Sequence, residues 1–129
     1  MSIFGLIGKT LTHSFSPTYF KNKFEREEII DAHYELFPLE NIEELLELKK
    51  NQPFLCGLNV TIPYKESIIP FLDRLDETAQ AIGAVNVVAF ENGATVGYNT
   101  DAYGFAQSIK PFLTFEHERA LIFGTGGAA

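Results

Sequence analysis

Segments typical of strands alternate with segments typical of helices through the first two thirds of this chain. Apolar stretches that suit strands cover 2–8, 32–37 and 54–62, and helical patterns at 16–27 and 41–50 lie between them. A strand followed by a helix usually rejoins its sheet through a crossover, which makes the next strand a parallel neighbour. The alternation therefore predicts an α/β protein with an open, mostly parallel mixed sheet and helices on both faces.

The second half of the chain adds shorter elements to this pattern. Helices are predicted at 64–72, 76–82 and 101–112, and strands at 84–90 and 95–98. Asn92-Gly93 is typical of a two-residue hairpin turn, so the two strands should pair and add an antiparallel edge. The last helix should be capped by Thr100 or Asp101.

Composition excludes several kinds of partner. The net charge of −7 argues against a nucleic-acid partner, although a local cation could still hold a small anion. No apolar run is long enough to span a bilayer, and the amino-terminal residues lack the layout of a signal peptide. The single Cys56 excludes an internal disulfide and, within an apolar run, is expected to be a small core residue. We therefore expect a cytoplasmic protein, and no metal site is predicted.

The stretch from Gly57 to Lys65 carries candidate chemistry at the end of a predicted strand. Asn59 and Thr61 share one face of that strand. Pro63 ends the strand because it has no N–H to donate, and Lys65 follows it. Ligands usually bind at strand ends in α/β sheets, so this face is a candidate ligand site. The alternative is an edge strand with a solvated polar face and a surface lysine.

Four further polar residues are candidates for the same site. Ser14 and Ser16 precede a helix that Pro17 opens, and their hydroxyls, with the free N–H groups of the first turn, suit a carboxylate or phosphate. The alternative is that Ser16 is the N-cap and Ser14 is exposed. Asn86 lies within an apolar strand and is either a satisfied core amide or a ligand contact. Asp101 is either an N-cap or a site residue.

Lys65 and Asp101 would acquire a specific role if the fold brought them together. An exposed lysine is a poor base at neutral pH because its pKa is about 10.4. A lysine and a carboxylate that are paired in a cleft titrate as a coupled unit. Such a pair could exchange a proton with a substrate hydroxyl while hydride moves elsewhere. Their proximity is a hypothesis at this point.

The carboxyl-terminal residues indicate the opening of a second domain. The apolar run 120–123 looks like a buried strand and leads into a glycine turn, 124–127, of the kind that normally opens a helix. No helix follows, so we expect a fragment with a domain at 1–113, a polar link at 114–118 and the start of another domain at 119–129. Without its own sheet, the strand at 120–123 is expected to be disordered or to pair with another chain.

Five motifs of this chain occur together in the order and spacing of a known enzyme family. They are His13-Ser14-Phe15-Ser16-Pro17, Asn59-Val60-Thr61-Ile62-Pro63-Tyr64-Lys65, Gly83-Ala84-Val85-Asn86, Asn99-Thr100-Asp101-Ala102-Tyr103-Gly104 and Gly124-Thr125-Gly126-Gly127-Ala128. The set resembles the shikimate dehydrogenases. The resemblance implies a substrate-binding domain, 1–113, that includes the connecting helix 101–112, followed by a Rossmann-type NADP-binding domain. It also implies the NADPH-dependent reduction of 3-dehydroshikimate to shikimate, a step toward chorismate and the aromatic amino acids.

The resemblance further implies roles for single residues. The substrate carboxylate would be held by Ser14 and Ser16. The ring hydroxyls would be held by Asn59, Thr61, Asn86 and Asp101. The catalytic pair would be Lys65 and Asp101, with Lys65 as the proton donor and acceptor. The backbone at Gly124, Gly126, Gly127 and Ala128 would approach the pyrophosphate of NADP.

The chain departs from the family pattern at two single positions and by its length. Phe20 stands where many members have a histidine and should change only the packing, and Thr125 replaces a commoner alanine. The cofactor helix and the basic residues that would read a 2′-phosphate are absent, so these residues alone are expected to be inactive. Preference for NADP over NAD is a family inference only.

Three other functions remain open at this level. The first is a quinate/shikimate dehydrogenase with broader specificity. The second is a non-catalytic carboxylate-binding module, against which the presence of both Lys65 and Asp101 argues. The third is an α/β domain whose polar residues are only caps and satisfied amides.

Overall fold

The structure is a computed structural model that describes all of residues 1–129. Its strands are β1 (Ser2–Gly8), β2 (Ala32–Pro38), β3 (Leu55–Val60), β4 (Arg74–Leu75), β5 (Val87–Glu91) and β6 (Ala94–Tyr98). Its α-helices are α1 (Ser16–Arg26), α2 (Leu45–Asn51), α3 (Tyr64–Ser67), α4 (Glu77–Ile82) and α5 (Asp101–Ile109). Short 3₁₀ helices are η1 (Ile42–Glu44), η2 (Ile69–Phe71) and η3 (Lys110–Phe112).

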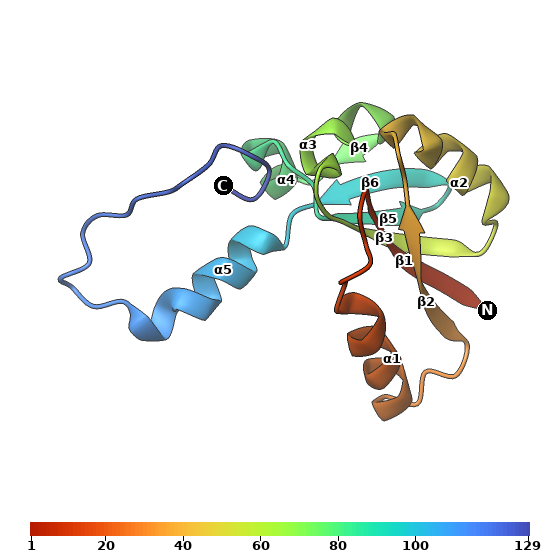
Figure 1. The fold of residues 1–129 in the computed structure, drawn as a ribbon, viewed down its shortest axis with the longest axis horizontal. Coiled ribbons are helices and arrows are strands. Elements are labelled where there is room, and N and C mark those ends of the chain that lie inside the picture. Colours follow the sequence, from red (N-terminus) through yellow and green to blue (C-terminus); the bar gives the residue numbers. More distant parts are fainter.

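All six strands form one open sheet in the order β2-β1-β3-β5-β6-β4 (Figure 1). β1 pairs in parallel with both β2 and β3, and β4 pairs in parallel with β6. β5 is antiparallel to β3 on one side and to β6 on the other. The predicted mixed sheet with mostly parallel pairs is confirmed.

Helices cover both faces of the sheet, as predicted. Figure 1 shows α1 on one side and α2 and α3 on the other. On the α1 side, the ring of Phe24 lies 6.1 Å from the ring of Phe4 in β1. The opposite side holds the main apolar core, whose buried members include Ile7, Leu45 and Ile68. Ile7, Leu45 and Ile68 are each at most 1% exposed, so this side of the sheet packs firmly beneath the strand ends where the polar motifs lie.

The hairpin between β5 and β6 is confirmed, but it does not form the edge of the sheet. Asn92 and Gly93 have φ angles of 50° and 83°, the left-handed pair that a tight two-residue turn requires. Outside β6 lies β4, which pairs through Arg74 and Leu75 alone. The predicted antiparallel edge is therefore wrong, since a two-residue strand is too short to show an alternating pattern.

The predicted helix at 64–72 is divided into α3 and η2. Pro70 lies in η2, near its amino-terminal end. A proline in a helix interior has no N–H for the fourth preceding carbonyl and clashes with it, so the α-helix cannot continue through this position. The division leaves α3 as a single turn that presents Lys65 near the end of β3.

Cys56 is exposed, and the prediction of a core cysteine is wrong. In the pairing of β1 with β3, Ile3 lies opposite Leu55 but Phe4 lies opposite Gly57. Cys56 is thus the extra residue of a β-bulge, and a bulge disturbs the alternation of side chains between the two faces. A single sequence gives no clear signal for such an insertion.

Residues 120–123 form no strand in this structure, and their assignment to the first strand of a second domain stays a prediction. Leu121, Ile122 and Phe123 are 78%, 66% and 91% exposed. No strand of the sheet pairs with them, and an isolated extended segment is not stable without a partner. Helix α5 and the residues after it extend away from the sheet before the terminus curls back toward α4 (Figure 1).

Among all the helices, none combines the length and hydropathy needed to cross a bilayer.

Candidate active site

The carboxyl ends of β1, β3 and β6, which are distant in sequence, lie together with the amino end of β5 along one side of the sheet; we call this side the strand-end edge. β1 and β3 are parallel, and β6 runs in the same direction because β5 is antiparallel to both β3 and β6. The segments that follow β1, β3 and β6, and the one that precedes β5, therefore meet at this edge. The N–H of Thr61 donates to the Ile7 carbonyl at 2.9 Å, and the N–H of Val60 donates to the Asn86 carbonyl at 2.8 Å.

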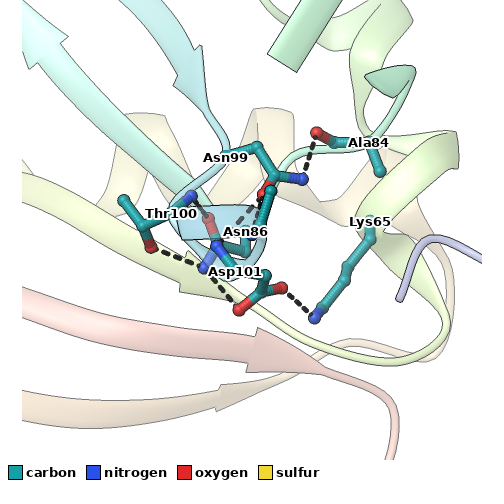
Figure 2. A network of polar contacts seen from close by, with 7 residues as sticks. Lys65, Ala84, Asn86, Asn99, Thr100 and Asp101 are labelled. Atoms are coloured by element: carbon teal, nitrogen blue, oxygen red, sulfur yellow. Dashed lines mark hydrogen bonds and ion pairs between the residues drawn. The ribbon is translucent and has the colours of Figure 1, made fainter. Parts of the chain in front are cut away.

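Lys65 and Asp101 are in direct contact at this edge, as hypothesised. The ammonium Nζ of Lys65 lies 2.5 Å from Oδ2 of Asp101. Figure 2 shows the two side chains pointing toward each other, with Asn86 beside the carboxylate. The Lys65 side chain is only 16% exposed, whereas that of Asp101 is 45% exposed. The ammonium is therefore partly withdrawn from water, and the carboxylate is its only ion-pair partner.

Asn86 joins the start of β5 to the start of α5. Its Nδ2 donates to Oδ1 of Asp101 at 2.9 Å and to Oγ1 of Thr100 at 2.8 Å. Its Oδ1 accepts from the N–H of Thr100 at 2.8 Å. The two N–H groups of Asn86 are thus satisfied within the protein, and a ligand contact through the remaining lone pair of Oδ1 stays a prediction. The structure also shows that this amide fixes the second oxygen of the Asp101 carboxylate (Figure 2).

Thr100 occupies the N-cap position of α5, one of the two predicted, but the side chain that accepts from the first turn of the helix is that of Asn99. Oδ1 of Asn99 accepts from the N–H groups of Asp101 and Ala102 at 3.0 and 3.2 Å. Its Nδ2 donates to the carbonyl of Ala84 at 3.0 Å. Asn99 is buried, and the side chain of Thr100 makes no capping bond. The capping side chain lies within the Asn99-Thr100-Asp101 motif. Which of these three polar side chains accepts from the helix N–H groups depends on the direction of each side chain, which the sequence does not give.

Ser14 and Ser16 lie between β1 and α1, and the prediction of Ser16 as N-cap is wrong. Ser16 is the first residue of α1, with Phe15 before it and Pro17 in the first turn as predicted. Oγ of Ser14 instead accepts from the N–H of Ser16 at 3.3 Å. Both serines are half-buried rather than exposed. Ser14 thus lies in the loop that follows β1, and Ser16 begins the helix after that loop.

Asn59 lies on the α1 side of β3 and contacts a residue that sequence reasoning did not single out. The hydroxyl of Tyr34 donates to Oδ1 of Asn59 at 2.7 Å. Burial raises the pKa of Tyr34 to about 12, and the side chain of Ser16 acts in the opposite direction. Ser16 and Asn59 therefore share Tyr34 as a neighbour. No pattern in β2 distinguishes this tyrosine from an ordinary strand residue.

The candidate residues fall into two groups along the strand-end edge. Lys65, Asn86 and Asp101 contact one another. The second group consists of Ser14, Ser16, Asn59 and Thr61, none of which makes a side-chain hydrogen bond to the first group. The two groups lie at the ends of neighbouring strands, so a small polar ligand between them could contact both. Chemically, the first group offers a proton and the second offers neutral hydrogen-bonding groups.

The glycine turn does not form a dinucleotide site in this structure. Gly124 has a φ of 124°, and a Cβ placed at Gly124 or Gly126 would meet no atom within 4 Å. No helix starts after the turn, so the N-terminal dipole that normally receives a pyrophosphate is lacking. Gly127 is the exception, because a Cβ there would lie 2.7 Å from Cβ of Lys65. The residues present do not fit NADP by themselves.

The chain has clear similarity to known proteins. A family model described as the shikimate dehydrogenase substrate binding domain matches residues 6–88. The NADP(+) shikimate dehydrogenase of Oceanobacillus iheyensis is 44% identical over 96% of this chain and 47% of its own length. The crystal structure of shikimate dehydrogenase 1 from Peptoclostridium difficile matches with a TM-score of 0.89 and 39% identity, over 99% of this chain and 48% of that one.

A further similar structure is a complex with a ligand. Shikimate 5-dehydrogenase from Thermus thermophilus, in complex with shikimate, matches with a TM-score of 0.86 and 35% identity. That match covers 99% of this chain and 49% of the Thermus chain. The chain thus spans about half the length of the relatives that it matches.

Proposed function

This chain belongs to the shikimate dehydrogenase family, and from that premise we propose that it is the substrate-binding part of an NADP-dependent shikimate dehydrogenase. The reaction is the reversible reduction of 3-dehydroshikimate to shikimate, within the cytoplasmic biosynthesis of chorismate and the aromatic amino acids. One observation carries the proposal: the 2.5 Å contact between Lys65 and Asp101 at the strand-end edge.

The substrate carboxylate lies against Ser14 and Ser16. Both hydroxyls can donate to an anion. The first turn of α1 adds little, because the N–H of Ser16 already donates to Oγ of Ser14 and Pro17 has no N–H. The overall charge of −7 opposes an anion, so local donors must supply the attraction. Asn59 and Thr61, on the neighbouring strand, contact ring hydroxyls together with Asn86 and Asp101.

Lys65 gives a proton to the substrate oxygen as the ketone becomes a hydroxyl, and accepts it in the reverse direction. An ammonium has three N–H groups, and the contact with Asp101 uses one of them. Asp101 holds the ammonium in place and is itself held by Asn86. Because the proton donor is fixed before the substrate arrives, little reorganisation is needed at the moment of transfer.

A complete cofactor domain is required for turnover. We assign 1–113 to substrate binding, 114–118 to a link, and 119–129 to the first segment of a Rossmann-type domain. Gly124, Gly126, Gly127 and Ala128 would then approach the NADP pyrophosphate once the rest of that domain is present. A polypeptide of these 129 residues therefore binds substrate but shows no NADPH-dependent activity.

The ion pair also separates this proposal from a non-catalytic binding module. Binding of a neutral hydroxyl needs only a donor or an acceptor, and a partly buried ammonium has a desolvation cost. Retention of Lys65 at 16% exposure, paired and aimed at the strand ends, is more typical of proton transfer than of simple recognition. A broader quinate/shikimate dehydrogenase keeps the same pair and is distinguished by its ligands.

The proposal is tested by titrating the chain with shikimate and following backbone amide chemical shifts. Saturable shifts are expected at Ser14, Ser16, Asn59, Thr61, Asn86 and Asp101. Ser14→Ala and Lys65→Ala should each weaken binding. A parallel titration with quinate distinguishes the broader enzyme, which would bind both ligands comparably. A well-folded sample whose spectrum does not change with shikimate contradicts the proposal.

A further inference from the structure

The side-chain amide of Asn59 makes a hydrogen bond through its oxygen only. Oδ1 accepts the hydroxyl of Tyr34 at 2.7 Å, whereas Nδ2 has no hydrogen-bond partner in the structure. Asn59 is half-buried, but no buried side-chain nitrogen or oxygen lacks a partner, so Nδ2 has surface that a ligand can reach. The amide therefore has a satisfied acceptor and two free donor N–H groups. This arrangement suits a ligand oxygen that accepts a hydrogen bond.

Tyr34 is itself held in place by an aromatic contact. The ring of Phe20 in α1 stacks on the ring of Tyr34, with centroids 4.4 Å apart and planes at 8°. Phe20 also meets the rings of Tyr19 and Phe24. The ring of Tyr34 is therefore fixed between α1 and the sheet, so its hydroxyl cannot easily follow a rotation of the Asn59 amide. A fixed hydroxyl is what an orienting partner requires.

The direction of the hydrogen bond decides which end of the amide faces a ligand. A tyrosine hydroxyl can accept as well as donate. In this structure the Tyr34 hydroxyl donates to Oδ1 of Asn59 at 2.7 Å. The other end of the amide, Nδ2, is therefore directed away from Tyr34 and keeps its two N–H groups free to donate.

We propose that Tyr34 is a positioning residue that sets the polarity of the Asn59 amide and thereby selects a ligand hydroxyl. This inference rests on the proposed function, because it concerns the same substrate site. Tyr34 makes no contact with substrate in this account. It acts through Asn59, and Phe20 supports it through the stacked ring.

Tyr34→Phe is the direct test, because it removes the hydroxyl and keeps the ring that stacks on Phe20. Shikimate affinity is measured by amide shifts for wild type, Tyr34→Phe, Asn59→Ala and the double variant. Tyr34→Phe should weaken binding between about threefold and tenfold, as expected for one hydrogen bond. In the Asn59→Ala background the same change should have no further effect.

Tyr98→Phe is the matched control, because the Tyr98 hydroxyl donates to Oε1 of Glu91 at 2.7 Å within the hairpin. It should leave shikimate affinity unchanged. The specificity readout is a series of shikimate analogues, each without one ring hydroxyl. One analogue should lose affinity relative to shikimate in wild type but much less in Tyr34→Phe and Asn59→Ala. A merely structural role for Tyr34 would weaken all ligands equally.

Each outcome decides the inference. If Tyr34→Phe binds shikimate as wild type does, or if its effect is undiminished in the Asn59→Ala background, the positioning role is refuted while the proposed function stands. If wild type does not bind shikimate, the proposed function fails and this inference fails with it. The inference is supported if Tyr34→Phe weakens shikimate binding in wild type but has no further effect in the Asn59→Ala background, and if the selective effect on one analogue is also seen.

Discussion

Lys65 and Asp101 are 36 residues apart in sequence, and their side chains meet at 2.5 Å. Lys65 is carried by α3 after β3, and Asp101 begins α5 after β6. Asn86 holds the other carboxylate oxygen from the start of β5. Segments next to β3, β5 and β6 therefore contribute one residue each, so the pair forms only when these three strands are assembled. Its geometry is a property of the fold and not of either helix.

Replacement of Lys65 should affect chemistry more than binding. The natural setting for this test is a chimera in which these residues are joined to the cofactor half of the Oceanobacillus iheyensis relative. We expect Lys65→Met to reduce kcat by about 10²- to 10⁴-fold, the usual contribution of a positioned proton donor. KM should change much less. Steady-state assays with shikimate across a range of pH provide the measurement.

Lys9→Met is the control for this prediction. Lys9 also forms an ion pair, 3.5 Å from Glu40, but both side chains are more than half exposed. Exposed pairs contribute little, so this variant should keep turnover within about twofold of the unmodified chimera. Comparable kcat values for the Lys65 and Lys9 variants would contradict the assignment of Lys65 as proton donor.

Asn99→Ala should destabilise the domain and loosen the site together. The change removes the cap of α5 and leaves the Ala84 carbonyl without its donor. A lost cap and an unsatisfied buried group cost about 1–3 kcal/mol of unfolding free energy. Urea denaturation measures this cost. Asn51→Ala, at the exposed end of α2, is the matched control and should change stability by less than about 0.5 kcal/mol. Equal effects of the two variants would refute the capping role.

Local signals in the sequence predicted most of the elements of this fold. Asn92-Gly93 defined a hairpin because the turn depends only on the φ angles of two residues. The strand-helix alternation predicted the parallel pairs, and the helices on both faces followed from it. The contact between Lys65 and Asp101 was only a hypothesis, because the sequence places each residue just beyond a predicted strand but does not give the relative direction of the two strands.

The misplaced features depend on contacts that a single sequence does not specify. Cys56 is exposed because β1 and β3 shift register there, which only the pairing reveals. Asn99 caps α5 because its amide also reaches the Ala84 carbonyl across the site. Tyr34 meets Asn59 although 25 residues separate them. Each depends on side-chain direction after folding, and no period in the sequence encodes that direction.

Alkaline pH should reveal the buried state of Tyr34. Burial raises its pKa to about 12, above the value of about 10 for an unfolded tyrosine. The folded state therefore favours the neutral phenol, and the stabilisation is fully present below about pH 10. It is lost as the pH rises from about 10 through about 12. Urea midpoints measured across this range should fall more steeply for wild type than for Tyr34→Phe.

The comparison with Tyr34→Phe isolates one group among several. Tyr64 and Tyr98 also have raised pKa values, through burial for Tyr64 and through the hydrogen bond to Glu91 for Tyr98. Wild type and Tyr34→Phe both contain these two tyrosines, so Tyr64 and Tyr98 contribute equally to the pH dependence of the urea midpoint in each protein. Parallel pH profiles for wild type and Tyr34→Phe would show that Tyr34 is not buried as the structure has it.

Two glycine-to-alanine changes should have opposite signs. A Cβ at Gly97 in β6 would lie 2.7 Å from Leu72, 2.7 Å from Leu75 and 2.8 Å from Val85, all side-chain atoms of the packed layer beneath the site. Overpacking of this kind costs about 1–3 kcal/mol. In contrast, a Cβ at Gly104 in α5 meets nothing within 4 Å, so alanine there should stabilise the helix by about 0.5–1 kcal/mol. Urea denaturation of both variants tests the packing directly. If Gly97→Ala left the free energy of unfolding unchanged, the packing between β6 and the segment 72–75 would be looser than these distances indicate. The segment that carries Asn99 and Asp101 would then be less firmly supported by the side chains beneath it.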